Sequence, residues 1–547
     1  MRIAAVLAAV ALLAGCTSQG DDAAASPEAA SPVATVATPP AEARASSTPT
    51  PSPTPTEAPV ETLAWGPTVE EWEDALATAQ ALPLRRAAGQ VMILDLYSSD
   101  PDAAAALVRE THAGGVILMG GAAPSAEAVA ALAAGVQQAD DRTWPVWVSA
   151  DEEGGVVSRL ASAVPSLPGF MAAGAATDKA AVTAAYASQG ADLRALGVNV
   201  DLAPVADVTI GPADPIIRSR SAGSDPAEVA RTVTAAVEGY LGGGVIPVIK
   251  HFPGHGSVTV DSHEALPVQE RGLKALARTD LEPFAAAIDA GAPAVMVGHI
   301  AVPAWGDGPA TLEHEAYAYL REELGFTGAA VTDALNMGAV TSGRAAGEAA
   351  VDALAAGADV LVMPADADAA IRAVVAAVRD GGLARARLDE AAARSILLMR
   401  WAGGLDASGP EPAYGRALAI AGTTVATADC ETPLVGRRAR IVSGSDEARR
   451  TLSRMLEAAG VEVGERGTSV ALVSSGRTAA TADVVVSLGD PWGLFGSDAR
   501  AYVATYGSSR AALAGLTRVL VGEAEPGGSW PVDMGDAPYP VCAVSGG

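Results

Sequence analysis

The segment KHFPGHGSVTVDSHEALP, which begins at Lys250, concentrates groups that can carry or transfer a proton. It contains three of the chain's six histidines, His251, His255 and His263, and one of its three lysines. Asp261 stands two residues before His263, so its carboxylate can accept a hydrogen bond from one ring nitrogen. That bond would orient the imidazole and leave the other nitrogen to move a proton. The spacing predicts a general acid/base at His263 with Asp261 as its partner.

A metal site is the main alternative for this segment. His251 and His255 are four residues apart, a spacing that would place both on one face of a helix. Pro253, Gly254 and Gly256 exclude a regular helix there, and no metal-binding motif surrounds the histidines. We therefore predict no metal, and nothing in the chain calls for another cofactor.

A carboxylate and a lysine complement the histidine. Asp333 follows the apolar run GAAVT, so we expect it to be partly buried and fixed. A fixed carboxylate facing a proton donor is the arrangement that cleaves glycosides through a covalent intermediate. Helix N-capping is the alternative role for Asp333. Lys250 stands out because this chain otherwise uses arginine for its cations, and a compact ammonium serves where a planar guanidinium does not fit.

Eight apolar runs alternate with Ala-rich segments and would position these groups. Their near-continuous apolar character is typical of parallel strands that are buried on both faces. Eight strand–helix units predict a (β/α)8 barrel, with a doubly wound sheet as the structural alternative. The runs are residues 91–97, 114–120, 144–155, 198–208, 245–254, 293–300, 328–336 and 358–365.

Polar residues close five of these runs at their carboxyl ends. In a barrel, the carboxyl ends of all strands meet on one face, and that face hosts the chemistry. One polar residue at a strand end is weak evidence, but the same pattern on five strands predicts a shared site. The residues are Asp151, Asp207, Lys250, His251, His299 and Asp333.

The amino terminus predicts export. Residues 1–16, MRIAAVLAAVALLAGC, combine an arginine, a short apolar run and small residues, as a signal peptide does. The ending LLAGC resembles a bacterial lipobox, with Cys16 as the lipidated residue; an ordinary signal peptide is the alternative. Residues 17–62 are rich in Pro, Ser, Thr and Ala and cannot bury a core. We expect a disordered tether that holds the protein at the outer face of the cell membrane.

Two globular domains follow the tether. We assign residues 63–408 to the barrel and 409–547 to a smaller α/β sandwich domain. Cys430 and Cys542 can form a disulfide in an exported chain, or remain two buried thiols. The net charge of −28 argues against nucleic acid and anionic membrane surfaces as partners, which leaves the lipid anchor as the only predicted membrane contact.

Six motifs along the barrel make the sequence resemble glycoside hydrolase family 3, in its bacterial β-N-acetylhexosaminidase branch. They occur in the order typical of that family. Together they are far more specific than any one of them. The motifs are DEEGG with SRL (151–160), GVNVDLAPVADV (197–208), RSRSAG (218–223), KHFPGHG with DSH (250–263), VMVGHI (295–300) and VTDALNMGA (331–339).

The resemblance implies an exo-acting, retaining β-N-acetylglucosaminidase. Asp333 matches the nucleophile, His263 the acid/base and Asp261 its partner. The implied substrates are glycans with terminal β-linked N-acetylglucosamine, from peptidoglycan or chito-oligosaccharides. The residues implied to bind the sugar are Asp151, Arg159, Asp207, Arg220, Lys250, His251 and His299.

Other functions stay open at this point. A β-glucosidase or β-xylosidase type of family member is disfavoured by the PGHG and DSH continuation. A phosphorylase that releases N-acetylglucosamine 1-phosphate is compatible with a histidine acid/base, which would not repel an anionic acceptor. A noncatalytic sugar-binding lipoprotein and a metal-dependent hydrolase on the same barrel are the alternatives from other classes. Ala222 and Val156 depart from the family's pattern and bear on fine specificity.

Overall fold

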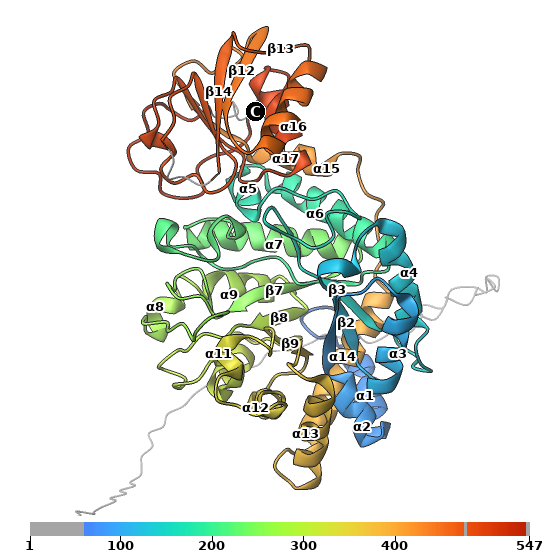
Figure 1. The fold of residues 1–547 in the computed structure, drawn as a ribbon. Coiled ribbons are helices and arrows are strands. Elements are labelled where there is room, and N and C mark those ends of the chain that lie inside the picture. The colour runs from blue at the N-terminus through green and yellow to red at the C-terminus, as the bar shows by residue number, and fades with distance from the viewer. Residues whose placement is uncertain (1–59, 475–478, 543–547) are drawn as a thin grey trace, which may run out of the picture. The chain divides into compact units, whose positions relative to one another are not determined.

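The computed structural model describes residues 60–474 and 479–542. The predicted signal peptide, Cys16 and the tether up to residue 59 lie outside these ranges. Within them, no helix is long and apolar enough to cross a membrane. The described chain forms an eight-stranded parallel barrel and a second domain with a six-stranded sheet (Figure 1).

Eight parallel strands form the barrel in the order β10-β1-β2-β3-β6-β7-β8-β9. A parallel bridge between Val331 and Val360 joins the two ends of that order and closes the barrel. The predicted (β/α)8 architecture is thereby confirmed. The strands are β1 (Met92–Leu96), β2 (Gly115–Leu118), β3 (Trp147–Ala150), β6 (Val200–Asp201), β7 (Ile246–Phe252), β8 (Ala294–Val297), β9 (Ala329–Thr332) and β10 (Leu361–Val362).

Almost every strand residue is buried, as expected for strands packed between a filled interior and a layer of helices. The run 144–155 differs from its prediction as one strand. Its strand β3 ends at Ala150, and β4 (Glu152–Gly154) pairs with β5 (Val157–Ser158) in a separate hairpin. Gly154 and Gly155 both have positive φ angles, of 88° and 61°, which turn the chain there.

Ala-rich helices surround the strands. Several begin at a side chain that accepts hydrogen bonds from the first free amides, such as Asp100, Ser125, Asp178 and Asp225. The helices are α1 (Val69–Ala81), α2 (Leu84–Gln90), α3 (Pro101–Thr111), α4 (Ala126–Gln137), α5 (Phe170–Ala175), α6 (Lys179–Ala195), α7 (Pro226–Gly242), α8 (Leu273–Leu276), α9 (Glu282–Asp289), α10 (His314–Ala318), α11 (Gly338–Thr341), α12 (Glu348–Ala356), α13 (Ala367–Arg379) and α14 (Arg385–Gly403).

The second domain has a mixed sheet in the order β11-β16-β15-β14-β12-β13, in which β11 and β16 alone pair antiparallel. Its strands are β11 (Thr424–Thr427), β12 (Arg438–Ser443), β13 (Glu462–Val463), β14 (Thr468–Val473), β15 (Val484–Ser487) and β16 (Ala501–Ala504). Its helices are α15 (Tyr414–Gly422), α16 (Asp446–Ala458) and α17 (Arg510–Leu520). A disulfide joins Cys430 to Cys542.

The two faces of this sheet are covered differently. Val470 and Leu472 of β14 pack with α16 and α17, whereas Ala471 and Val473 point to the opposite face, as alternate strand residues must. On that face the described chain places aromatic residues of irregular segments, among them Trp530, where a sandwich would place helices. The domain packs on the barrel through α15, which lies against α5 and α6.

Candidate active site

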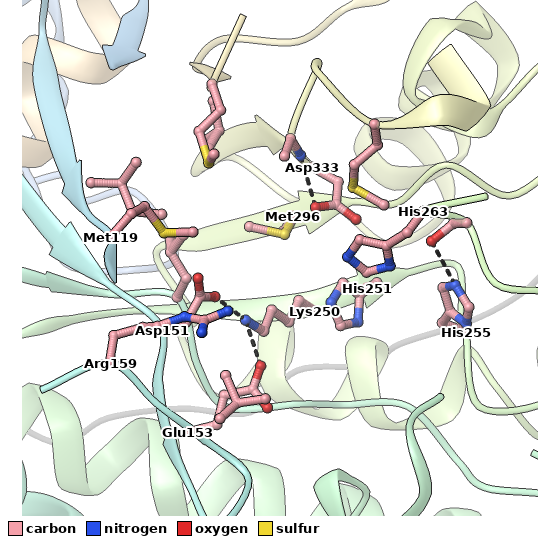
Figure 2. Close-up of a pocket in the computed structure, with 18 of the residues that line it drawn as sticks. Met119, Asp151, Glu153, Arg159, Lys250, His251, His255, His263, Met296 and Asp333 are labelled. Atoms are coloured by element: carbon pink, nitrogen blue, oxygen red, sulfur yellow. Dashed lines mark hydrogen bonds and ion pairs between the residues drawn. The ribbon is translucent and has the colours of Figure 1, made fainter. Parts of the chain in front are cut away.

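A cavity of about 450 Å³ opens at the carboxyl ends of the barrel strands. Seven of the ten predicted site residues line it. They are Asp151, Arg159, Arg220, Lys250, His251, His263 and Asp333. Figure 2 shows six of these side chains converging from β3, β7, β9 and the loops that follow them. Every lining residue belongs to the barrel.

Lys250 anchors a buried polar cluster on one side of the cavity. Its ammonium lies 2.6 Å from a carboxylate oxygen of Asp151 and 2.7 Å from one of Glu153. Arg220 donates two hydrogen bonds to Glu153, at 2.8 and 2.9 Å. Burial alone would lower the pKa of Lys250, but the two carboxylates raise it above its ordinary value. The ammonium therefore stays charged and can donate to a sugar hydroxyl.

Glu153 was not predicted as a site residue, although it stands in the DEEGG motif. It is buried, lines the cavity and accepts hydrogen bonds from both cations of the cluster. Burial would raise its pKa, but Arg220 and Lys250 hold the pKa well below its usual range. A glutamate three residues beyond the end of β3, beside two glycines, was the available signal.

Asp333 follows β9 directly and is buried in the cavity wall. Its carboxylate accepts a hydrogen bond from the Ala334 amide at 2.8 Å, and its own amide donates to the Val297 carbonyl at 3.0 Å. Burial would raise the pKa of Asp333, but the neighbouring imidazoles, the Ala334 amide and the Lys250 ammonium lower it to about 2. The carboxylate is therefore ionised and rigidly held at neutral pH, as a nucleophile must be.

His263 and Asp261 form the predicted pair. The Nδ1 atom of His263 lies 2.7 Å from Asp261 Oδ1, which also accepts from the His263 amide at 2.9 Å. The imidazole is 65% exposed and lines the same cavity as Asp333. Figure 2 shows its ring close to the Asp333 carboxylate. With Nδ1 engaged, Nε2 is the atom that can exchange a proton with a substrate.

His255 anchors the loop that carries this pair. Its Nε2 atom lies 2.9 Å from the hydroxyl of Ser262, the residue between Asp261 and His263. Its amide donates to Asp207 Oδ1 at 2.6 Å. The sequence singled out this histidine only as a metal ligand, and its structural role was missed. No group of three or more His, Cys, Asp or Glu side chains that could hold a metal is found in residues 60–474 and 479–542.

Asp207, which the sequence predicted to bind the sugar, does not line the cavity. It is fully buried, and its carboxylate accepts from the His251 amide at 3.2 Å and lies 2.8 Å from His251 Nδ1. Burial would raise the pKa of Asp207, but His251 and His255 lower it. Asp207 therefore positions the imidazole of His251, which does line the cavity.

His299, another predicted sugar-binding residue at a strand end, does not line the cavity either. Its Nε2–H donates to the Ala334 carbonyl at 2.9 Å, and its Nδ1 lies 2.8 Å from the hydroxyl of Thr311. The ring is fully buried, burial lowers its pKa, and both nitrogens are engaged within the protein. His299 thus faces Thr311 and the Ala334 carbonyl instead of the cavity. It fixes the peptide that follows Asp333.

Arg159, Val156 and Ala222 differ in how exposed they are and in whether they line the cavity. Arg159 lines the cavity and its amide donates to the Asp151 carbonyl at 3.1 Å. Val156 is 78% exposed, and Ala222 is buried beside the Arg220 turn. Val156 stands where the family often has an arginine and Ala222 where it usually has an aromatic residue; neither lines the cavity, so the polar cluster itself is intact.

A buried ionised carboxylate and a histidine–aspartate pair at one barrel cavity are groups that can cleave a glycosidic bond. The model of the glycosyl hydrolase family 3 N-terminal domain matches residues 84–398, and the chain belongs to that family. Among its relatives, β-hexosaminidase A of Pseudoalteromonas piscicida is 34% identical over 252 residues, which are 43% of this chain and 42% of that protein. β-Hexosaminidase LpqI of Mycobacterium tuberculosis is 36% identical over 282 residues, 50% of this chain and 70% of that protein.

Solved structures of glycoside hydrolase family 3 proteins superimpose on this chain. A family 3 β-N-acetylglucosaminidase from Paenibacillus sp. superimposes with a TM-score of 0.73 and 29% identity, over 83% of this chain and 99% of its own. The structure of M. tuberculosis LpqI superimposes with a TM-score of 0.55 and 32% identity, over 62% of this chain and 97% of its own. The family and these relatives support the expectation of a β-N-acetylglucosaminidase drawn from the sequence.

Proposed function

We propose that this protein is an exo-acting, retaining β-N-acetylglucosaminidase. The observation that carries the proposal is that Asp333, buried and ionised, and the Asp261–His263 pair line one cavity at the barrel's carboxyl face. That cavity is lined at the strands by Ile117, Met296 and other interior side chains, so it ends in the packed barrel. A blind cavity takes the terminal residue of a glycan.

The reaction runs in two displacements. In the first, a proton on Nε2 of His263 passes to the glycosidic oxygen while the Asp333 carboxylate attacks the anomeric carbon, which releases the aglycone and forms a glycosyl-enzyme ester. In the second, His263, now neutral, takes a proton from water, and the water oxygen attacks the anomeric carbon and frees Asp333. Asp261 keeps the imidazole oriented through both steps, because it holds Nδ1.

The polar cluster binds the sugar. Lys250 and Arg220 donate to hydroxyls, while Asp151 accepts from them. These groups are already paired with each other, so they are fixed before the sugar arrives. A preformed set of donors and acceptors lowers the entropy lost on binding and strengthens interactions in the transition state.

We further propose that the protein is exported and anchored by lipid on Cys16, with residues 17–62 as the tether. The sequence of the amino terminus supports this proposal. Such a location makes peptidoglycan fragments the expected substrates, in which N-acetylglucosamine is linked to a muramic acid residue. Chito-oligosaccharides fit the same catalytic residues.

The test compares aryl β-N-acetylglucosaminide with aryl β-glucoside, using the full-length protein, its Asp333→Asn variant and a chelator throughout. We expect preferential cleavage of the acetamido sugar and a loss of at least about a thousandfold in Asp333→Asn. Preference for the glucoside would contradict the assignment, and folded wild-type protein that cleaves neither would indicate a sugar-binding lipoprotein. Added phosphate, with analysis for sugar 1-phosphate, then distinguishes a phosphorylase from a hydrolase.

A further inference from the structure

Two key residues of the polar cluster lie on turns outside the barrel strands. Glu153 belongs to the β4–β5 hairpin, and Arg220 ends the short 3-10 turn Arg218–Arg220. The ladder of barrel hydrogen bonds therefore does not fix either residue. Their mutual geometry, with two hydrogen bonds from Arg220 to Glu153, depends on what supports the turns from outside.

Asp490 of the second domain holds the Arg218–Arg220 turn. Its carboxylate accepts from Arg218 Nε at 2.6 Å and also contacts the terminal guanidinium nitrogen. The other carboxylate oxygen accepts from the Ser219 amide at 3.0 Å. Asp490 is buried, and its own carbonyl accepts from the Ser487 hydroxyl at the end of β15. One carboxylate thus holds both the side chain and the backbone just before Arg220.

The Arg218–Arg220 turn needs support from other residues because its backbone is in an unfavourable conformation at Arg218. Arg218 has a φ angle of 51°, in the left-handed region that is unfavourable for a residue with a side chain. Asp214 provides part of the support, since its carboxylate accepts from the amides of Ile216, Ile217 and Arg218. Asp490 holds the guanidinium and the next amide, which Asp214 does not reach.

Tyr506, just after β16, supports the turn of the β4–β5 hairpin beside Glu153. Its carbonyl accepts from the Gly169 amide at 3.0 Å. Gly169 lies so close to Gly155 that a Cβ on Gly155 would stand 2.6 Å from the Gly169 Cα atom. The Gly155 amide also donates to the Leu167 carbonyl at 3.0 Å. The second domain thus supports, through residues 167–169, the glycine turn next to Glu153.

We propose that the second domain positions the sugar-binding cluster, with Asp490 as a positioning residue that acts through the Arg218–Arg220 turn. All described residues that line the cavity belong to the barrel, so Asp490 acts on the cluster through the turn and not as a lining residue. Nearly all of M. tuberculosis LpqI superimposes on only 62% of this chain. The described support therefore belongs to a part of this chain that the superposition with LpqI leaves largely uncovered.

The test measures kinetics of the full-length protein with an aryl β-N-acetylglucosaminide. Asp490→Ala should raise KM and lower kcat/KM by about tenfold to a hundredfold, because displacing a binding group by about 1 Å has that effect. Asp483→Ala is the matched control. Asp483 also accepts from an amide and a hydroxyl, both of Ser469, but it lies within the second domain. Equal kcat/KM in the two variants would overturn the proposal.

A double-mutant cycle separates positioning from a loss of stability. If Asp490 acts partly through Arg218, then Arg218→Gln alone raises KM, and the rise in the double variant is smaller than the product of the two single-variant rises. Fully additive effects, or a normal KM in Arg218→Gln, would overturn the proposal. Arg218→Gln keeps the Ser219 contact and serves where Asp490→Ala fails to fold. The proposal rests on the glycosidase function, so the binding of N-acetylglucosamine is also measured by calorimetry. Weaker binding in Arg218→Gln supports positioning even if the wild type cleaves nothing. Unchanged binding in Arg218→Gln contradicts the proposal.

Discussion

Glu153→Gln tests the electrostatics of the polar cluster most directly. The Glu153 carboxylate lies 2.7 Å from the Lys250 ammonium and accepts two hydrogen bonds from Arg220. Because the two cations hold its pKa well below the usual range despite burial, it is ionised at neutral pH. Glutamine keeps the shape, removes the charge and turns an amide nitrogen toward groups that can only donate.

The expected loss follows from burial. Removing one partner of a buried ion pair destabilises a protein by about 3–5 kcal/mol, because the remaining charges stay desolvated. Each kcal/mol shifts the melting temperature by roughly 2–4 °C in a domain of 150–250 residues and by less in a larger one. We therefore expect Glu153→Gln to melt about 5–10 °C below the wild type, with kcat/KM reduced at least about tenfold as Lys250 and Arg220 move.

Glu152→Gln is the matched control one residue away. Glu152 is equally buried, but it has no cation beside it, and burial raises its pKa to about 7. Its carboxylate accepts from the Ser158 hydroxyl and, at 2.7 Å, from the Leu160 amide. A glutamine can accept from the same amide and donate to the hydroxyl, so it resembles the protonated acid. Little change in melting temperature is expected at pH 7.

Differential scanning calorimetry at pH 7 on the wild type and both variants supplies the comparison, and kinetics with the aryl substrate supply the second readout. Equal losses in the two variants would refute the argument that paired charge, and not volume or burial, stabilises the cluster. A larger loss in Glu152→Gln would refute it as well.

Three further outcomes follow from the same structure. Burial raises the pKa of Glu152 from 4.5 to about 7. The stability that protonated Glu152 contributes is therefore present below pH 4.5 and is lost as the pH rises to about 7. In Glu152→Gln, the free energy of unfolding by urea should fall less between pH 5 and pH 8 than in the wild type. Asp207→Asn should lower kcat/KM about tenfold or more, because a charge-assisted contact that orients His251 is lost. Replacing Cys430 and Cys542 by serine opens a loop that spans 112 residues and should cost about 2–5 kcal/mol in urea unfolding, with kcat unchanged.

The strand ends could be predicted because a strand that is buried on both faces has a continuous apolar sequence. Each barrel strand is an apolar run, and the first charged residue after it marks the carboxyl face. Asp151 and Asp333 follow β3 and β9 directly, and Lys250 and His251 lie within β7. Because all the strands are parallel, these side chains had to meet, and they do.

The direction in which a strand-end side chain points could not be predicted in the same way. Asp207 and His299 carry the same signal as Asp151, yet both are fully buried behind the cavity. Their orientation is decided by partners that lie elsewhere in the chain, His251 for Asp207 and Thr311 for His299. A buried polar group turns toward the partner that satisfies it, and a pattern of apolar runs contains no information about that partner.

The second domain shows the same limit over a longer range. Asp490 and Arg218 are 272 residues apart, and nothing near Asp490 distinguishes it from any aspartate that follows a strand. This domain contains no histidine, so the sequence predicted acid–base chemistry in the barrel alone. The composition of the domain did not indicate that it supports the turns that carry Glu153 and Arg220. A catalytic role needs particular functional groups, which composition reveals, whereas a positioning role needs only a rigid contact at the right place. Its consequences therefore have to be sought in KM and in coupling between substitutions, not in the types of residue that the domain contains.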